Sequence, residues 1–216
     1  MEPQSQQPLL QLNALVPRGE DAKPLNWSLQ AGEQVAICGE EGCGKSTLMR
    51  ILAGLLPPVA GEVRLAGRPL SQWPATERAA QIGVLFRQPE QHFLTAEVGE
   101  EIGFGLQPIL SQPSDPRIAP LLEPLRIPHS WWGRPLAQLS AGQRARVALA
   151  AVLVHRPPLL LADEPGALLS EQGELELAQW LTQQLPTLLI FTSRPSRAAR
   201  FAQRVYTLEQ GLLIPA

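Results

Sequence analysis

The sequence predicts an α/β fold built on a mostly parallel sheet, and two features of its pattern lead to that prediction. Short continuous apolar runs recur along the chain, and segments with helical apolar spacing lie between several of them. Such runs are typical of strands that are buried on both faces, as in parallel sheets covered by helices. The second feature is a glycine-rich turn that joins one apolar run to a helical pattern. Together these features predict strands and helices that alternate and pack in layers.

The expected strands are distributed over the whole chain. They are residues 9–12, 25–29, 34–38, 62–66, 82–86, 159–162, 188–191, 205–208 and 212–214. The last two runs flank Gln210-Gly211, which predicts a hairpin. Helices are expected over residues 47–53 and over residues 144–155, where the apolar residues follow the spacing i, i+3, i+4, i+7.

The composition excludes several classes of protein. The 216 residues carry a net charge of −2 and 44% of them are hydrophobic, so the chain can form a core but presents no basic face for nucleic acid. No apolar run approaches the roughly 20 residues that span a bilayer. Residues 1–8 are expected to form a flexible polar tail without a targeting signal. The two cysteines and three histidines show no metal-ligand spacing, and we expect a cytoplasmic protein.

The glycine-rich turn has the spacing G-x-x-x-x-G-K-S of a phosphate-binding loop. It consists of Gly39, Glu40, Glu41, Gly42, Cys43, Gly44, Lys45 and Ser46, and Thr47 continues into the expected helix. Glycines allow successive N–H groups to face a phosphate, and the helix N-terminus adds a favourable dipole. Lys45 is expected to reach the phosphates, where its charge also serves catalysis, and the Ser46 hydroxyl is expected to ligate Mg²⁺. These nine residues are the predicted nucleotide-binding residues of this loop.

An acidic pair follows another apolar run. Asp163 and Glu164 come directly after residues 159–162, and ligands gather at the carboxyl ends of parallel strands. Asp163 is expected to hold Mg²⁺, directly or through water, and Glu164 to orient or deprotonate an attacking water. The alternative is an ordinary strand end capped by two exposed acids, but the phosphate-binding loop favours the functional interpretation.

Residues 139–143, Leu-Ser-Ala-Gly-Gln, predict the start of a helix. Ser140 is a good N-cap, and Gln143 three residues later completes a capping box. The same helix start can bind an anion, because Gly142 permits close approach to a phosphate. The structural and the binding interpretation are compatible with each other.

The domain organisation is expected to be simple. Prolines recur through residues 107–135, so any helices there must be short. We expect an inserted helical subdomain over about residues 89–150, within a single domain that spans residues 1–216.

Three ordered motifs, at residues 39–46, 139–143 and 163–165, resemble those of the ATP-binding-cassette (ABC) ATPase family, whose usual Leu-Ser-Gly-Gly-Gln signature differs only at Ala141. The resemblance covers about residues 9–214. It implies a P-loop NTPase core with a mostly parallel sheet, an antiparallel β region, ATP and Mg²⁺ as cofactors, and ATP hydrolysis coupled to transport. It also implies a head-to-tail homodimer or heterodimer, in which Ser140, Gly142 and Gln143 of one subunit close on the nucleotide of the other.

Residues 84–93 and 98–105 resemble the energy-coupling-factor branch of this family, the importers of cobalt, nickel and vitamins. This resemblance implies an integral membrane transporter subunit as a partner, and a place on the inner face of the cell membrane. The haem-exporter ATPases are the alternative, because they are also short and can carry Leu-Ser-Ala-Gly-Gln.

Besides Ala141, the chain departs from the family pattern at three positions, and it also lacks an aromatic residue between Leu12 and Pro24, where the family often stacks adenine. Directly after Phe86 the family usually has a glutamine that contacts Mg²⁺, whereas this chain has Arg87 and then Gln88. Either Gln88 is the metal contact, which we favour, or Arg87 approaches the phosphates as a cation. Ser193 stands where the family places a histidine near the γ-phosphate, and is the third expected catalytic residue. Ser170 replaces an aspartate but remains a good N-cap for the next helix.

These departures leave two functions open. With Lys45 and Glu164 intact, the chain is expected to be the ATPase subunit of a membrane importer. The substitutions at the three departing positions favour the alternative, a degenerate nucleotide-binding subunit that binds ATP and hardly hydrolyses it, because loss of one stabilising donor slows phosphoryl transfer about a hundredfold.

Overall fold

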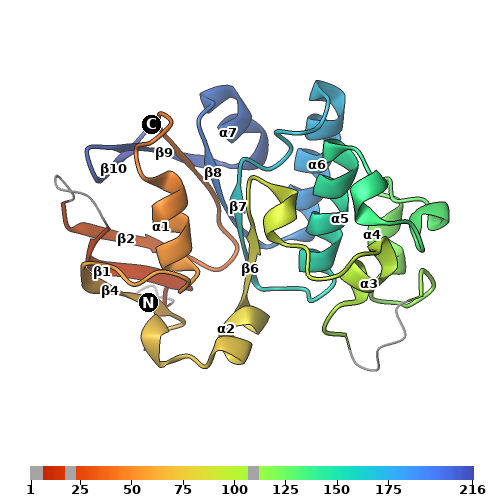
Figure 1. Cartoon of the computed structure of the whole chain (residues 1–216). Helices are drawn as coiled ribbons and strands as arrows, with labels where there is room; N and C mark the ends of the chain where they lie inside the picture. Colours follow the sequence, from red (N-terminus) through yellow and green to blue (C-terminus); the bar gives the residue numbers. More distant parts are fainter. Residues whose placement is uncertain (1–6, 18–22, 107–111) are drawn as a thin grey trace, which may run out of the picture.

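A six-stranded sheet runs through the middle of the molecule (Figure 1), in a computed structural model that describes residues 7–17, 23–106 and 112–216. Its strands, in the order β10-β9-β3-β8-β7-β6, are Leu212–Pro215, Arg204–Glu209, Gln34–Cys38, Thr187–Thr192, Leu159–Asp163 and Ile82–Leu85. All neighbouring pairs are parallel except the β9–β10 hairpin. The predicted parallel sheet and the predicted hairpin are both confirmed.

A second sheet of four antiparallel strands lies beside the first, on the side of α1 (Figure 1). Its order is β2-β1-β4-β5, with the strands Leu25–Leu29, Leu10–Val16, Ala60–Leu65 and Arg68–Pro69. The antiparallel region that the family resemblance implied is therefore present. Strand β5 was not predicted, because two residues, one of them a proline, are too few to show a pattern.

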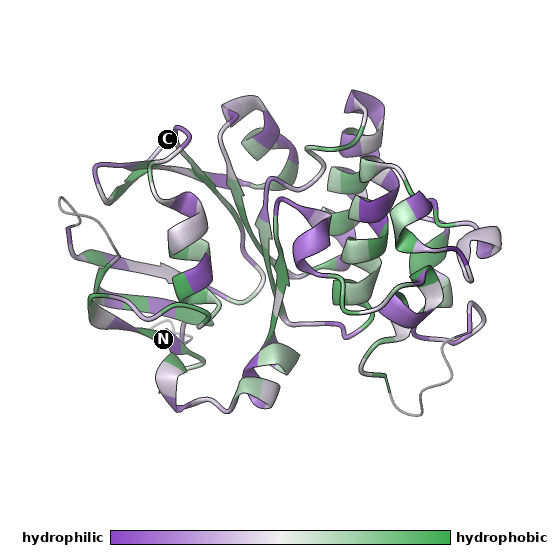
Figure 2. Ribbon diagram, viewed as in Figure 1, coloured by the Kyte–Doolittle hydropathy of each residue, from purple (hydrophilic) through white to green (hydrophobic). Residues whose placement is uncertain are grey.

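Alternation of side chains along the central strands divides the core into two parts. On β3, Val35 and Ile37 pack with α1 and the antiparallel sheet, whereas Ala36 and Cys38 pack with the helices on the opposite face. β7 and β8 alternate in the same way, so both faces of the sheet are covered. Figure 2 shows hydrophobic residues along these strands and along the helix surfaces that face them.

Helices lie on both faces of the central sheet. The α-helices are α1 (Lys45–Leu52), α2 (Ala75–Gln81), α3 (Val98–Gly103), α4 (Ala119–Leu122), α5 (Ala141–Leu153), α6 (Glu171–Gln184) and α7 (Pro195–Phe201). The 3₁₀ helices are η1 (Leu70–Gln72), η2 (Pro89–Gln91), η3 (His129–Trp131) and η4 (Leu136–Gln138). The three expected helices are present, as α1, α5 and, after Ser170, α6.

In residues 112–135, the described part of the proline-rich stretch, the helices are short, as predicted: α4 has four residues and η3 has three. Residues 107–111 at its start lie outside the described residues, as do residues 1–6 of the expected tail. Within the described ranges, no helix combines the length and the apolar composition needed to cross a bilayer.

We predict that the central strand β7 tolerates truncation poorly. Leu161 is fully buried on this strand, so Leu161→Ala should lower the free energy of unfolding by about 2–5 kcal/mol through lost burial and a cavity. Leu55→Ala is the matched control, because the Leu55 side chain is 55% exposed and its truncation should change the stability by less than about 0.5 kcal/mol. Urea unfolding of both variants measures the difference, and equal effects would contradict the assignment of β7 to the core.

Candidate nucleotide-binding site

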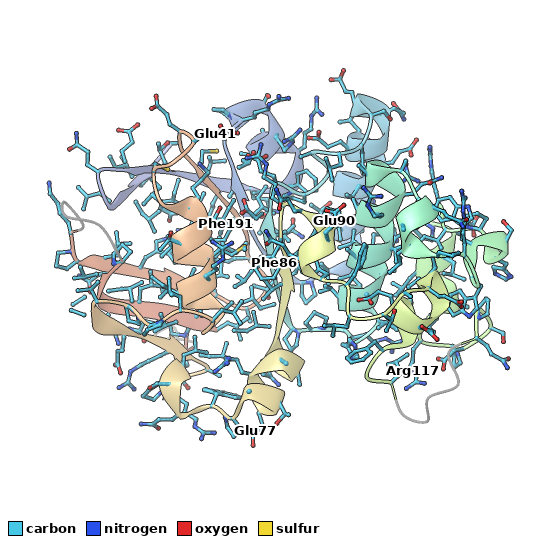
Figure 3. The ribbon with its side chains drawn as sticks, in the orientation of Figure 1. Glu41, Glu77, Phe86, Glu90, Arg117 and Phe191 are labelled. Carbon is cyan, nitrogen blue, oxygen red and sulfur yellow. The ribbon has the colours of Figure 1, made fainter. Side chains whose placement is uncertain are left out.

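The carboxyl ends of three adjacent strands bring the predicted motifs together. β3, β8 and β7 are neighbours in register, with Cys38 opposite Thr192 and Phe191 opposite Asp163. The glycine-rich loop, Ser193 and Glu164 follow these strand ends directly. Figure 3 shows Phe191 near the middle of the molecule and Glu41, on the loop, at its upper edge. Parallel pairing therefore assembles one site from segments that are far apart in the sequence.

Three glycines allow the loop to turn back on itself. Gly42 and Gly44 adopt left-handed φ angles of 83° and 102°, which glycine accepts without steric cost. At Gly39, an added Cβ atom would lie 2.6 Å from the Cys43 Sγ atom and 2.9 Å from the Leu208 carbonyl oxygen. The fixed glycines of the motif thus have physical reasons in this structure.

Lys45 lies inside the loop, and its side chain is largely buried. Its ammonium group donates hydrogen bonds to the carbonyl oxygens of Gly39 and Glu40, each at 2.7 Å. An ammonium group has three donors, so Lys45 can bind a phosphate while it keeps part of this contact.

Ser46 and Asp163 bring two oxygen atoms to one point at the start of α1. The Ser46 hydroxyl donates to Asp163 Oδ2 at 2.7 Å. Burial raises the pKa of Asp163, although the Ser46 hydrogen bond and nearby cations oppose that shift. A hydroxyl and a carboxylate are ligands that Mg²⁺ accepts together with phosphate and water oxygens. These two residues therefore fit a magnesium site, although the described residues contain no cluster of three His, Cys, Asp or Glu side chains that could hold a metal.

Glu164 is the most heavily constrained side chain of the site. Its backbone has φ 52°, a left-handed conformation that is uncommon for a residue with a side chain. Its carboxylate accepts hydrogen bonds from the Ser193 N–H at 2.6 Å and the Ser193 hydroxyl at 2.8 Å. It also accepts from the Thr192 hydroxyl at 2.9 Å and from Arg197 at 2.7 Å. Burial raises the pKa of Glu164, but these four donors outweigh burial and hold the pKa below its ordinary value.

A single polar pocket collects most of the predicted residues. It is lined by Glu41, Gly42, Gly44, Lys45, Ser46, Thr47, Arg87, Asp163, Glu164 and Ser193. Gly39, Glu40 and Cys43 belong to the same loop but do not line the pocket. Gln88 and the residues of the 139–143 motif also lie outside its lining.

The 139–143 motif forms the predicted capping box. The Gln143 N–H donates to the Ser140 hydroxyl, and the Gln143 side chain accepts from the Ser140 N–H. At Gly142, a Cβ atom would lie 2.8 Å from the Leu168 carbonyl oxygen, so glycine allows α5 to pack closely on the segment before α6. Ser170 caps α6 as predicted, since its hydroxyl accepts from the Gly173 N–H at 3.2 Å.

The structure places Arg87, and not Gln88, in the pocket. The Arg87 guanidinium lies 3.2 Å from a carboxylate oxygen of Glu41, which also lines the pocket. The Gln88 side chain instead accepts a hydrogen bond from Gln91 at 3.2 Å. Arg87 also lowers the pKa of Asp163, although burial remains the larger effect.

Sequence reasoning missed the residue that holds the chain just before Arg87. The Phe86 N–H donates to His92 Nε2 at 2.8 Å, and the two rings lie 5.1 Å apart. Burial lowers the pKa of His92 to about 4, so the imidazole is a neutral acceptor at pH 7. A single histidine in a loop carries no periodic signal that could have predicted this contact.

Sequence reasoning also missed a buried ion pair behind Glu164. Arg197 on α7 donates to both carboxylate oxygens of Glu174 on α6, at 2.8 and 2.9 Å, in addition to its contact with Glu164. Two helices that pack together bring these charges into contact, and neither helix shows a motif that indicates the pair.

Comparison with known proteins decides the family. Residues 22–167 match the sequence model of the family described as ABC transporter. The chain belongs to this family. The family resemblance of the three ordered motifs is thus confirmed, and the chain is an ABC ATPase.

The relatives include members of the energy-coupling-factor branch, as predicted. The energy-coupling factor transporter ATP-binding protein EcfA1 of Enterococcus faecalis is 32% identical over 96% of this chain and 78% of its own length. The structure of CbiO1 from Clostridium perfringens, part of the transporter complex CbiONQ, is 28% identical, with a TM-score of 0.81 over 97% of this chain and 88% of its own.

A dimeric ATP-binding cassette, MJ0796, bound to ADP and Pi in a post-hydrolysis state, is a further structural neighbour. It is 25% identical, with a TM-score of 0.78 over 94% of this chain and 96% of its own. The haem-exporter alternative receives no support from these relatives.

We predict that Arg87 contributes more to nucleotide binding than Gln88. Arg87→Ala should weaken ATP binding about fivefold, because a partly exposed charge contact contributes up to about 1 kcal/mol. Gln88→Ala should leave the affinity unchanged, since its side chain lies outside the pocket lining. Calorimetric titration with ATP, with and without Mg²⁺, measures the affinity of both variants. A loss confined to Gln88→Ala with Mg²⁺ present would instead identify Gln88 as the metal contact.

Proposed function

We propose that this chain binds MgATP in the pocket that the glycine-rich loop lines, and hydrolyses it as the ATPase subunit of an energy-coupling-factor importer. The observation that carries the proposal is the convergence of Lys45, Ser46, Asp163 and Glu164 at the ends of adjacent parallel strands. The similarity to EcfA1 and to CbiO1 supports the choice of an importer.

The predicted site residues other than Gln88 have the following roles in this proposal. The backbone N–H groups of the glycine-rich loop and the Lys45 ammonium would bind the phosphates. Ser46 and Asp163 would hold Mg²⁺, which neutralises charge on the phosphate oxygens when it is bound. Glu164 would accept a proton from the attacking water. Ser193 would assist Glu164, to which its hydroxyl donates a hydrogen bond at 2.8 Å.

A second ATPase subunit is part of the proposal. Ser140, Gly142 and Gln143 do not line the pocket of their own chain, which is consistent with a role at the nucleotide of a partner subunit. The dimeric state of the MJ0796 cassette supports this arrangement. We propose a head-to-tail homodimer or heterodimer, with no part played by nucleic acid.

An integral membrane transporter subunit is the other proposed partner. The CbiO1 structure is described as part of a transporter complex, which supports an assembly of this kind for the present chain. The chain would then lie on the cytoplasmic side, at the inner face of the cell membrane.

Removal of the Lys45 charge should abolish tight ATP binding. Lys45→Ala is expected to weaken ATP binding by roughly 10- to 100-fold, because charge-assisted hydrogen bonds contribute about 1.5–3 kcal/mol. The chain offers a matched control in Lys23→Ala, since Lys23 is its other lysine and is exposed. Calorimetry with MgATP, after a check that both variants keep the wild-type Tm, measures the effect. Equal affinity of the two variants for MgATP would show that this pocket is not the nucleotide-binding site.

Glu164→Gln separates hydrolysis from binding. The amide cannot accept a proton, so turnover should fall by a factor of about 10²–10⁴ while the affinity for MgATP changes little. Steady-state phosphate release and calorimetry on the same protein measure the two quantities. If Glu164→Gln and wild type release phosphate at the same low rate, the degenerate subunit becomes the better description of this chain.

A further inference from the structure

The polar pocket carries more acidic than basic side chains, although it is proposed to bind a polyanion. Among the described residues that line it, the charged ones are the acids Glu41, Asp163 and Glu164 and the bases Lys45 and Arg87. Both bases have partners within the chain. The Lys45 ammonium donates to two carbonyl oxygens of its own loop, and the Arg87 guanidinium lies 3.2 Å from a Glu41 carboxylate oxygen.

These two sets of partners differ in kind. The partners of Lys45 are neutral carbonyl groups, and an ammonium group with three donors can add a phosphate to them. The partner of Arg87 is a full negative charge. A guanidinium binds carboxylates and phosphates with the same planar set of N–H donors. Glu41 and a phosphate are therefore alternative partners for Arg87.

The sheet topology places this ion pair across the site. Glu41 belongs to the loop that follows β3, and Arg87 follows β6 (Figure 3 labels Glu41 and Phe86, the residue before Arg87). In the sheet, β8 and β7 lie between β3 and β6, so these two strands are about 14 Å apart. The ends of β8 and β7 carry Ser193 and Asp163. The ion pair thus joins two segments that leave the sheet on either side of these residues.

The exposure of the pair makes it easy to open. The Arg87 side chain is 57% exposed and the Glu41 side chain is 73% exposed. Solvent-exposed ion pairs are weak, and they change an equilibrium by a factor of about five or less. The phosphates of a nucleotide carry more charge than one carboxylate, so they can displace Glu41 from Arg87. The energy of the lost pair is then subtracted from the energy of binding.

We propose that Glu41 is an affinity-determining residue, which competes with the nucleotide phosphates for the Arg87 guanidinium. Arg87 binds either Glu41, as in this structure, or the phosphates. The inference deepens the proposed function and rests on it, because it takes this pocket as the ATP site.

Two other relations between the pair and the nucleotide would give different results. If Arg87 binds Glu41 and a phosphate at the same time, Glu41 helps to hold Arg87, and its removal lowers the affinity. If Glu41 only repels the phosphates, its removal raises the affinity with or without Arg87. The gain is then larger without Arg87, because the arginine no longer neutralises the acid.

A double-mutant cycle tests the competition. The full chain, Glu41→Gln, Arg87→Gln and the double variant are titrated calorimetrically with a non-hydrolysable ATP analogue in the presence of Mg²⁺. Glu41→Gln should raise the affinity about three- to fivefold when Arg87 is present. In the Arg87→Gln background the gain from Glu41→Gln should be smaller by a factor of about two or more, because no guanidinium remains to be released.

Glu40→Gln is the matched control. It removes the same charge from the same loop, but Glu40 does not line the pocket. Its effect on the affinity should be the same factor with Arg87 as in the Arg87→Gln background. Glu40, Glu41 and Arg87 are all exposed, so every variant should keep the wild-type Tm.

The proposal is overturned if Glu41→Gln lowers the affinity, or if its gain is equal or larger in the Arg87→Gln background. It is also overturned if Glu40→Gln depends on Arg87 as strongly as Glu41→Gln does, since the effect would then belong to the charge of the loop in general. Any of these results, with a wild-type chain that binds the analogue, leaves the proposed function standing. A wild-type chain that does not bind the analogue contradicts the proposed function itself.

Discussion

The central sheet is buried on both faces, and this burial fixes the register of its parallel strands. A shift of one residue in β3, β7 or β8 would exchange the side chains of the two cores and expose each set to the wrong neighbours. The register in turn brings the ends of these strands to one level, with Asp163 opposite Phe191 and Cys38 opposite Thr192. The chemistry of the site therefore depends on apolar packing in the strands behind it.

The site combines tight packing with a high density of charge. Lys45, Asp163, Glu164 and Arg197 are all buried or nearly so, and each has a partner among the described residues. Buried charges need such partners, because desolvation without compensation is costly. Burial raises the pKa of Asp163, whereas at Glu164 the four donors outweigh burial and lower the pKa. The two adjacent carboxylates therefore differ in proton affinity.

The structure shows which contacts are made by the residues that depart from the family pattern. Ser193, which stands in place of a histidine, binds Glu164 through both its N–H and its hydroxyl. Arg87 reaches the rim of the pocket and meets Glu41, while Gln88 lies outside the pocket lining. Ser170 retains the helix cap. The hydrogen-bond network around Glu164 therefore includes Ser193, which departs from the family pattern, together with Thr192 and Arg197, which lie outside the three ordered motifs.

The sequence by itself determined the fold class, the positions of the described strands other than β5, the glycine-rich loop and the two helix caps, because each follows from local periodicity or from a motif of fixed spacing. It also predicted that Asp163 would face the loop, since strand ends in parallel sheets meet at one edge. Only the tertiary structure placed Arg87 in the lining of the pocket, brought His92 to the Phe86 N–H, and paired Arg197 with Glu164 and Glu174. These contacts join side chains on separate elements, and their partners depend on how the elements pack, which no local pattern encodes.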